Sequence, residues 1–229
     1  MSNIDAEALR GKLDSDGFAI LPALLDPDNC EALRSLYADE RHFRSRVIMQ
    51  RHHFGRGEYQ YLRYPLPSHV STLRGRLYAV LAPIANDWAH ALGEERKYPP
   101  QHQDYLQNCH AAGQARPTPL ILKYGAGDYN CLHQDLYGEQ VFPLQAVIML
   151  SSPGDDFQGG ELVLVEQRPR AQSRPQVIRM NQGDAVIFAV NQRPKQGVRG
   201  TYRVRMKHGV SRVEAGERYT LGIIFHDAQ

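Results

Sequence analysis

Residues 131–139 read CLHQDLYGE, and within this stretch His133 and Asp135 stand two positions apart, directly after a segment with a strand pattern. In an extended chain, residues two apart point to the same side, with their Cα atoms about 6.5 to 7 Å apart. His133 and Asp135 can therefore face one space, as two ligands of a single metal ion would.

A third ligand is offered by residues 201–208, TYRVRMKH. Here basic and apolar residues alternate, so that His208 shares the inward face with Val204 and Met206. Two histidines and one carboxylate match the facial triad that binds Fe(II) and leaves positions open for other ligands. The alternative is a chance spacing beside a histidine that merely packs in the core.

The second half of the chain has the pattern of a β protein. After Pro117 the apolar period changes from 3.6 to 2, and turn sequences such as GAGD, NQGD and EAGE separate short apolar runs. Strands are predicted near residues 120–124, 145–150, 161–165, 177–180, 185–190, 202–208 and 219–225. Seven or eight short strands in succession are typical of an antiparallel sandwich or jelly roll.

The first half reads as mainly helical. Asp26 and Pro27 form the start of one helix. Residues 68–93 carry one apolar stripe and predict a second helix, with a kink expected at Pro83. Residues 101–112 fit a further short helix. We therefore predict an α+β fold in one domain, residues 1–229. Residues 1–116 would form a mainly helical layer over a jelly-roll core of residues 117–229.

Cysteines and the chain start bear on the cellular compartment. Three cysteines with no CxxC pattern do not indicate a disulfide framework or a zinc site. The first residues lack the basic start and apolar run of a signal peptide, and no stretch reaches the roughly 18 apolar residues of a membrane span. A cytoplasmic protein without a membrane partner is expected.

Arg218 opens the last predicted strand, ten residues after His208. A buried guanidinium without a partner is strongly disfavoured, so Arg218 requires an anion. A small dicarboxylate that chelates a metal at one end would place its far carboxylate near such an arginine, in the bidentate geometry that a guanidinium suits. The alternative is a salt bridge to an acidic residue of the chain.

Taken together, HQD at 133–135, HGV at 208–210 and RYT at 218–220 resemble the Fe(II)- and 2-oxoglutarate-dependent dioxygenases. The resemblance implies a double-stranded β-helix core, with iron bound by His133, Asp135 and His208. It implies that Arg218 binds the distal carboxylate of 2-oxoglutarate, helped by Tyr124 and Thr220. The activity implied is hydroxylation of a substrate C–H bond with O2, releasing succinate and CO2, with no further catalytic acid, base or nucleophile.

Closer relatives differ in which motifs they share. LKYGAGDYNCLHQD, residues 122–135, resembles the AlkB-type nucleic-acid dealkylases, in which a tyrosine nine residues before the first histidine contacts the cosubstrate. The interval from His208 to Arg218 and the GGEL turn resemble prolyl hydroxylases. Ile224 stands where AlkB-type enzymes carry a second arginine. A small bacterial oxygenase family described as acting on damaged DNA is a further resemblance.

Basic residues are concentrated in two segments. Residues 168–212 hold eleven Lys or Arg against one acid, and residues 41–64 hold six Arg against one acid, although the whole chain is only +2. The second segment interleaves cations with aromatic rings, a composition suited to phosphates and base stacking. An alkylated nucleic-acid base is therefore the first substrate hypothesis, with four candidate contacts: Arg51, Arg56, Tyr59 and Tyr61.

Other substrates and another class of protein stay open. A protein side chain, hydroxylated as prolyl hydroxylases do, and a small metabolite are the alternative substrates. A jelly roll that binds a metal without catalysis is the alternative of another class. Cys131 lies on the face of His133 and Asp135 if the strand continues, and we interpret it as a core residue.

Overall fold

The structure, a computed structural model, describes residues 4–136, 138–198 and 200–229. Its four described α-helices are α1 (Ala6–Asp16), α2 (Pro27–Ser35), α3 (Ser68–Ala91) and α4 (His102–Ala111). Asp26 caps α2 as predicted, because its carboxylate accepts a hydrogen bond from the backbone N–H of Asn29 at 2.8 Å. The helix α3 runs through Pro83 as one element.

The larger sheet contains eight described strands, all paired antiparallel. Along the sheet they follow the order β1 (Phe18–Leu21), β11 (Ala185–Ala189), β7 (Leu144–Met149), β14 (Val213–Ile224), β5 (Leu120–Gly125), β4 (Glu58–Leu62) and β2 (Phe43–Ile48), with β8 (Phe157–Gly159) also paired to β14. Its central strand β14 pairs with β5 and β7, and Arg218 lies opposite Tyr124.

The smaller sheet follows the order β10 (Arg174–Ile178), β9 (Leu162–Gln167), β13 (Gly200–Val210), β6 (Tyr129–His133) and β3 (Gly55–Arg56), with β12 (Gln192–Gly197) also paired to β13. In β13, Val204, Met206 and His208 are buried, whereas Arg203 and Arg205 are exposed, which is the alternation expected from the sequence. His208 therefore points into the protein.

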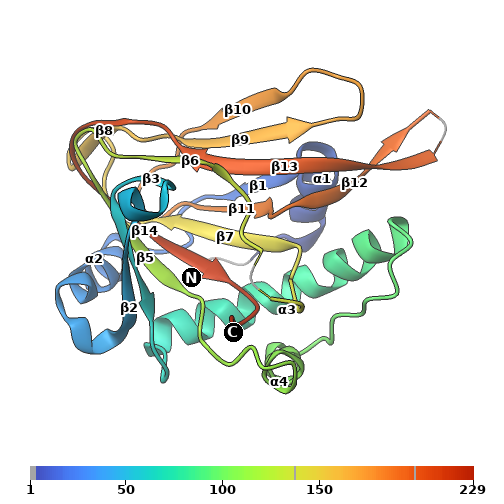
Figure 1. Cartoon of the computed structure of the whole chain (residues 1–229), viewed down its shortest axis with the longest axis horizontal. Helices are drawn as coiled ribbons and strands as arrows, with labels where there is room; N and C mark the ends of the chain where they lie inside the picture. Colours follow the sequence, from blue (N-terminus) through green and yellow to red (C-terminus); the bar gives the residue numbers. More distant parts are fainter. Residues whose placement is uncertain (1–3, 137, 199) are drawn as a thin grey trace.

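The two sheets face each other, and α3 and α4 lie on the side of the larger sheet away from the smaller one (Figure 1). From β5 onward the chain passes repeatedly between the sheets: β5, β7, β11 and β14 belong to the larger sheet, and β6, β9, β10, β12 and β13 to the smaller. This is the double-stranded β-helix predicted from the sequence, so the α+β fold class is confirmed.

The first 116 residues are less purely helical than expected. They supply β1, β2 and β4 to the larger sheet and β3 to the smaller one, in addition to three 3-10 turns, η1 (Leu36–Ala38), η2 (Glu40–His42) and η3 (Met49–His52). The strands β2 (FRSRVI) and β4 (EYQYL) are short and mix polar with apolar residues, so their apolar signal is weak. Outside these 116 residues, the strand β12 was also not predicted. It contains Pro194, and proline lowers strand propensity.

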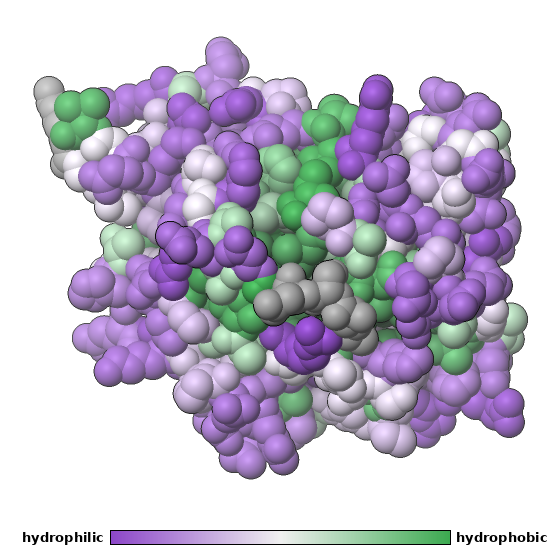
Figure 2. All heavy atoms as spheres, turned by 180° about the vertical axis from the view of Figure 1, so that it is seen from behind, coloured by the Kyte–Doolittle hydropathy of each residue, from purple (hydrophilic) through white to green (hydrophobic). Residues whose placement is uncertain are grey.

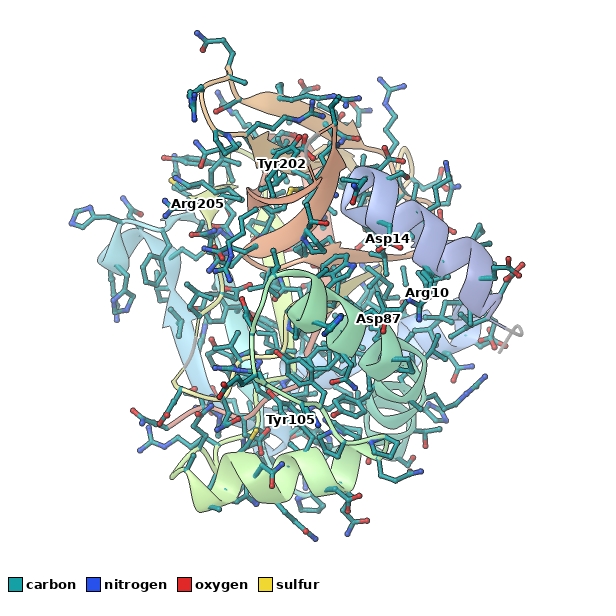
Figure 3. The ribbon with its side chains drawn as sticks, turned by 90° about the vertical axis from the view of Figure 1, so that its right-hand side faces the viewer. Arg10, Asp14, Asp87, Tyr105, Tyr202 and Arg205 are labelled. Atoms are coloured by element: carbon teal, nitrogen blue, oxygen red, sulfur yellow. The ribbon has the colours of Figure 1, made fainter. Side chains whose placement is uncertain are left out.

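Polar contacts hold α1 against α3. Trp88 donates its indole N–H to Asp14 at 2.7 Å, and Arg10 pairs with Asp87 at the surface. Figure 3 shows Arg10 and Asp14 on α1 facing the helix that carries Asp87. The helices therefore pack on each other as well as on the sheet.

A buried arginine ties the end of the chain to α3. Arg74, 1% exposed, pairs with Asp227, which is fully buried, at 2.8 Å and donates to the carbonyl of Ile224 at 2.9 Å. The carboxylate of Asp227 also accepts from Tyr64 Oη at 2.8 Å and lies 2.9 Å from His110 Nε2. The end of the chain is thus anchored to α3 by a buried network of charged and polar groups.

The surface seen from behind is mostly hydrophilic, and apolar side chains gather in a recessed area near its middle (Figure 2). Among the described residues, no helix combines the length and apolar character needed to cross a membrane.

Candidate active site

Three potential metal ligands converge between the sheets. One ligand atom from each of His133, Asp135 and His208 can be chosen so that all lie within 4.8 Å of one another. His133 Nε2 is 3.5 Å from Asp135 Oδ1, and His208 Nε2 is 3.1 Å from Asp135 Oδ2. The three residues singled out from the sequence are thus brought together as one cluster.

Strand register places the two histidines side by side. His133, the last residue of β6, lies opposite His208 of β13, and their ring centroids are 4.1 Å apart. His133 Nδ1 lies 2.8 Å from the carbonyl oxygen of Cys131, which orients the ring with Nε2 toward Asp135. The register shifts between His208 and Val210, where β6 carries one extra residue, and Cys131 is exposed rather than in the core as expected.

The charges of the cluster suit a divalent cation. Burial raises the pKa of Asp135, but the neighbouring His208 and His133 outweigh it and hold that pKa well below its usual value. Burial lowers the pKa of His208, which favours the neutral imidazole that a metal requires. Burial also acts to lower the pKa of His133, but the hydrogen bond and charge of Asp135, together with backbone hydrogen bonds at Cys131 and His208, outweigh it and raise that pKa.

Arg218 lines the same cavity as the cluster and is 1% exposed. Its guanidinium carbon is 5.5 Å from the centre of the Tyr124 ring, and its Nη1 is 3.5 Å from Thr220 Oγ1. Among the described residues, Nε and Nη2 of Arg218 have no hydrogen-bond partner, and no acid pairs with it. Arg218, Tyr124 and Thr220 therefore lie together as expected, and Arg218 presents N–H groups that have no partner among the described residues.

The guanidinium stays charged despite its burial. Burial lowers the pKa of Arg218 to about 10, which leaves it protonated at neutral pH. A buried cation with free N–H groups costs free energy until an anion binds it. Burial likewise raises the pKa of Tyr124, so its hydroxyl remains a donor.

A cavity of about 450 Å³ joins the cluster to Arg218. Apolar side chains from both sheets form much of its wall, including Leu122, Val147, Leu162 and Phe188. A few polar groups converge inside an otherwise apolar space, as is usual in sites for small molecules.

Two polar residues of this cavity were missed in the sequence. Gln145 on β7 contacts Asp135 and His208, and Asn130 on β6 donates to Tyr124 Oη at 3.3 Å. Gln145 is the one polar residue in the strand LQAVIM, and this break in an apolar run was the available signal. Asn130 gave no such signal, because the register shift in β6 decides which way it faces.

The four substrate candidates have different environments. Tyr59 lines the cavity, whereas Tyr61 packs with Leu120 and Ile224 and is not among the lining residues. Arg51 and Arg56 are exposed and also lie outside the lining. Tyr61, two residues from Tyr59 on β4, packs against two residues that themselves line the cavity, and the role of all four candidates in substrate binding stays a prediction.

The aromatic side chain at the cavity mouth is Phe54, which was not a candidate. It is 48% exposed, lines the cavity together with His53, and stacks on His52 with ring centroids 5.4 Å apart. Gly55 fixes this loop on β6, since a Cβ at Gly55 would lie 2.3 Å from the carbonyl oxygen of Tyr129.

A jelly roll that holds a His-Asp-His cluster and a buried, unpaired arginine in one cavity defines the class of Fe(II)- and 2-oxoglutarate-dependent oxygenases. The family of the chain is shown by the similarity of its sequence to a known family. Residues 57–228 match the family Oxygenase-NA, described as an oxygenase catalysing oxidative methylation of damaged DNA. The chain belongs to this family and is an oxidoreductase that uses Fe(II), 2-oxoglutarate and O2.

Similar proteins include an uncharacterized protein of Mycobacterium tuberculosis, from strains H37Rv and CDC 1551. It is 51% identical over 164 residues, which are 72% of this chain and 70% of that protein. A prolyl hydroxylase of Trichoplax adhaerens in complex with a hypoxia inducible factor peptide has a TM-score of 0.62 and 14% identity over 97% of this chain and 89% of its own.

A Pseudomonas putida prolyl-4-hydroxylase has a TM-score of 0.56 and 14% identity, covering 95% of this chain and 96% of its own. A 2OG-Fe(II) oxygenase family oxidoreductase of Burkholderia pseudomallei has a TM-score of 0.55 and 15% identity, covering 99% and 94%. At these identities, the solved structures share the fold.

Proposed function

We propose that His133, Asp135 and His208 bind Fe(II), that Arg218 with Tyr124 and Thr220 binds the distal carboxylate of 2-oxoglutarate, and that the enzyme hydroxylates an alkyl group on a nucleic-acid base. The observation that carries this proposal is the pairing of the ligand cluster with a buried guanidinium whose Nε and Nη2 lack partners among the described residues. Two imidazoles and a carboxylate fit Fe(II), and an unpaired guanidinium fits a carboxylate.

When bound, iron and 2-oxoglutarate would supply the oxidant for hydroxylation with O2, with one oxygen atom entering the substrate C–H bond and the other entering succinate as CO2 leaves. The residues of the chain position the cosubstrate and keep water away from the site. Arg218 would hold the distal carboxylate of the cosubstrate in the cavity, and the Tyr124 hydroxyl would offer that carboxylate a further donor. The apolar wall limits water beside the cluster.

Arg218→Lys is expected to raise the KM for 2-oxoglutarate while leaving iron affinity unchanged. Lysine keeps the charge but loses the planar fork, and a charge-assisted hydrogen bond contributes about 1.5 to 3 kcal/mol, which corresponds to about 10- to 150-fold in KM. The measurement is succinate release against 2-oxoglutarate concentration.

The matched control is Arg193→Lys. Arg193 is also fully buried but pairs with Glu166, outside the cavity, so its replacement should affect stability and not the KM for 2-oxoglutarate. Unchanged dependence on 2-oxoglutarate in Arg218→Ala would rule out the assigned role of Arg218.

Three observations support a nucleic-acid base as substrate. The family description names damaged DNA. Phe54 and Tyr59 offer aromatic faces at the mouth and wall of the cavity, and base stacking on such rings is tolerant of sequence. Exposed Arg51 and Arg56 flank Phe54 in the chain, where they can contact phosphates beside an extruded base.

Binding of a single-stranded oligonucleotide with one methylated base should weaken steeply with salt. For four phosphate contacts, the slope of log K against log salt is about −3 for a single strand. The double variant Arg51→Ala/Arg56→Ala should flatten that slope by about 1.4, because two contacts are lost. Phe54→Ala should instead lower affinity by about 5- to 150-fold at constant slope, since stacking contributes about 1 to 3 kcal/mol per base.

Fluorescence anisotropy at several salt concentrations measures both effects. Lys12→Ala, an exposed cation on α1, is the control and should change neither slope nor affinity. Absence of binding at low salt, or binding indifferent to Phe54 and both arginines, would rule out the nucleic-acid substrate. The protein side chain and the small metabolite would then be tested by succinate release.

A further inference from the structure

Gln145 is a buried amide beside the ligand cluster, in contact with two of its three residues. It lies on β7 of the larger sheet, is 5% exposed, and faces the cavity. Its Nε2 is 2.9 Å from Asp135 Oδ2 and 3.2 Å from His208 Nε2. Among the described residues, its Oε1 has no hydrogen-bond partner.

Chemistry fixes which end of this amide faces the cluster. A carboxylate only accepts hydrogen bonds, so the reversed amide would bring two oxygen acceptors together beside Asp135. The NH2 end therefore points at Asp135 and the carbonyl end points away from it. The NH2 end carries partial positive charge, and so does the cation that the same carboxylate would bind.

Asp135 needs a fixed partner more than the histidines do. His133 and His208 lie opposite each other in paired strands, and His133 is further oriented by the carbonyl oxygen of Cys131. Asp135 follows the end of β6 and belongs to no strand. Gln145 is held in β7 by pairing with β11 and β14, so it presents a rigid donor to a carboxylate on an irregular segment.

We infer that Gln145 is a positioning residue for the metal: its amide holds one oxygen of Asp135, which turns the other oxygen toward the cation. This inference rests on the proposed iron site. The outer partners of metal ligands orient them in this way, and their loss lowers metal affinity by about 10- to 100-fold.

The test is the affinity for Co(II), a redox-stable substitute for Fe(II), measured on the full chain without substrate. Gln145→Leu keeps the size of the side chain and removes the amide, so the Kd for Co(II) should rise by about 10- to 100-fold. The visible absorption of bound Co(II) should also change, because the carboxylate is free to rotate.

Gln60→Leu is the matched control. Gln60 is also 5% exposed and donates one buried hydrogen bond, to the carbonyl of Tyr37 at 3.0 Å, but it lies outside the cavity. Both variants lose a buried amide, so their thermal stabilities should fall comparably, whereas only Gln145→Leu should lose metal affinity.

An unchanged Kd and spectrum in Gln145→Leu, or an equal rise of Kd in both variants, would overturn the positioning role while leaving the iron site intact. If the unchanged protein and His208→Ala bind Co(II) equally, the proposed iron site itself fails, and the role of Gln145 fails with it.

Discussion

Asp135→Ala is expected to lower 2-oxoglutarate-dependent succinate release by more than about 100-fold. Loss of a residue that hydrogen-bonds to a metal ligand costs up to about 100-fold, and loss of the ligand itself must cost at least as much. The variant leaves two imidazoles for the cation and removes the charge that compensates it. Anaerobic addition of Fe(II) and 2-oxoglutarate should give a weak visible charge-transfer band in the unchanged protein and no band in the variant.

Asp184→Asn is the control for this experiment. Asp184 is another buried carboxylate, 6% exposed, but it accepts hydrogen bonds from the backbone N–H groups of Ala23 and Asn181, away from the cavity. Its replacement should leave the band in place. A band that survives in Asp135→Ala would exclude Asp135 as a ligand, whereas a protein that binds Fe(II) without any band or succinate release would fit a non-catalytic jelly roll.

Arg74→Met should lower the free energy of unfolding by about 3 to 5 kcal/mol, the usual cost of leaving one member of a buried ion pair alone. Asp227 would stay buried without its cation, and the carbonyl of Ile224 at the end of β14 would lose its donor. Denaturant unfolding followed by fluorescence of Trp88 measures the change.

Arg10→Met provides the comparison. Arg10 pairs with Asp87 across α1 and α3, but the two side chains are 38% and 62% exposed. Exposed pairs contribute about 0 to 1 kcal/mol, so this variant should unfold almost as the unchanged protein does. Equal losses in both variants would contradict the structural role of Arg74.

The strands of the core and the ligand cluster could be predicted because they depend on local pattern. Alternation in residues 201–208 put His208 on the inward face, and the His-x-Asp spacing put Asp135 beside His133. For His208 the structure agrees because β13 is extended, so that a period of two determines direction. Asp135 lies just past the end of β6, and its carboxylate is still 3.5 Å from His133 Nε2.

Other parts of the site depend on which segments meet in space. Gln145 could be seen as a polar residue in an apolar strand, but its contact with Asp135 follows from the pairing of β7 in the larger sheet. Phe54 reaches the cavity because β3 pairs with β6, an interaction between two residues of each strand that no local pattern indicates. Tyr61 packs against Leu120 and Ile224, and its role in substrate binding stays a prediction.

The loop of Phe54 and the strands of the ligand cluster have different tolerance for change. His133, His208 and Arg218 sit on paired strands, where insertion of one residue would turn every following side chain to the opposite face. Phe54 follows the 3-10 turn η3 in the surface connection between β2 and β3, and a change in η3 ahead of it leaves the pairing of β3 with β6 in place. Mutations in the loop of Phe54 could therefore change which substrates bind while the cluster and Arg218 stay in place. Substrate specificity is thus expected to evolve faster than the oxidative chemistry.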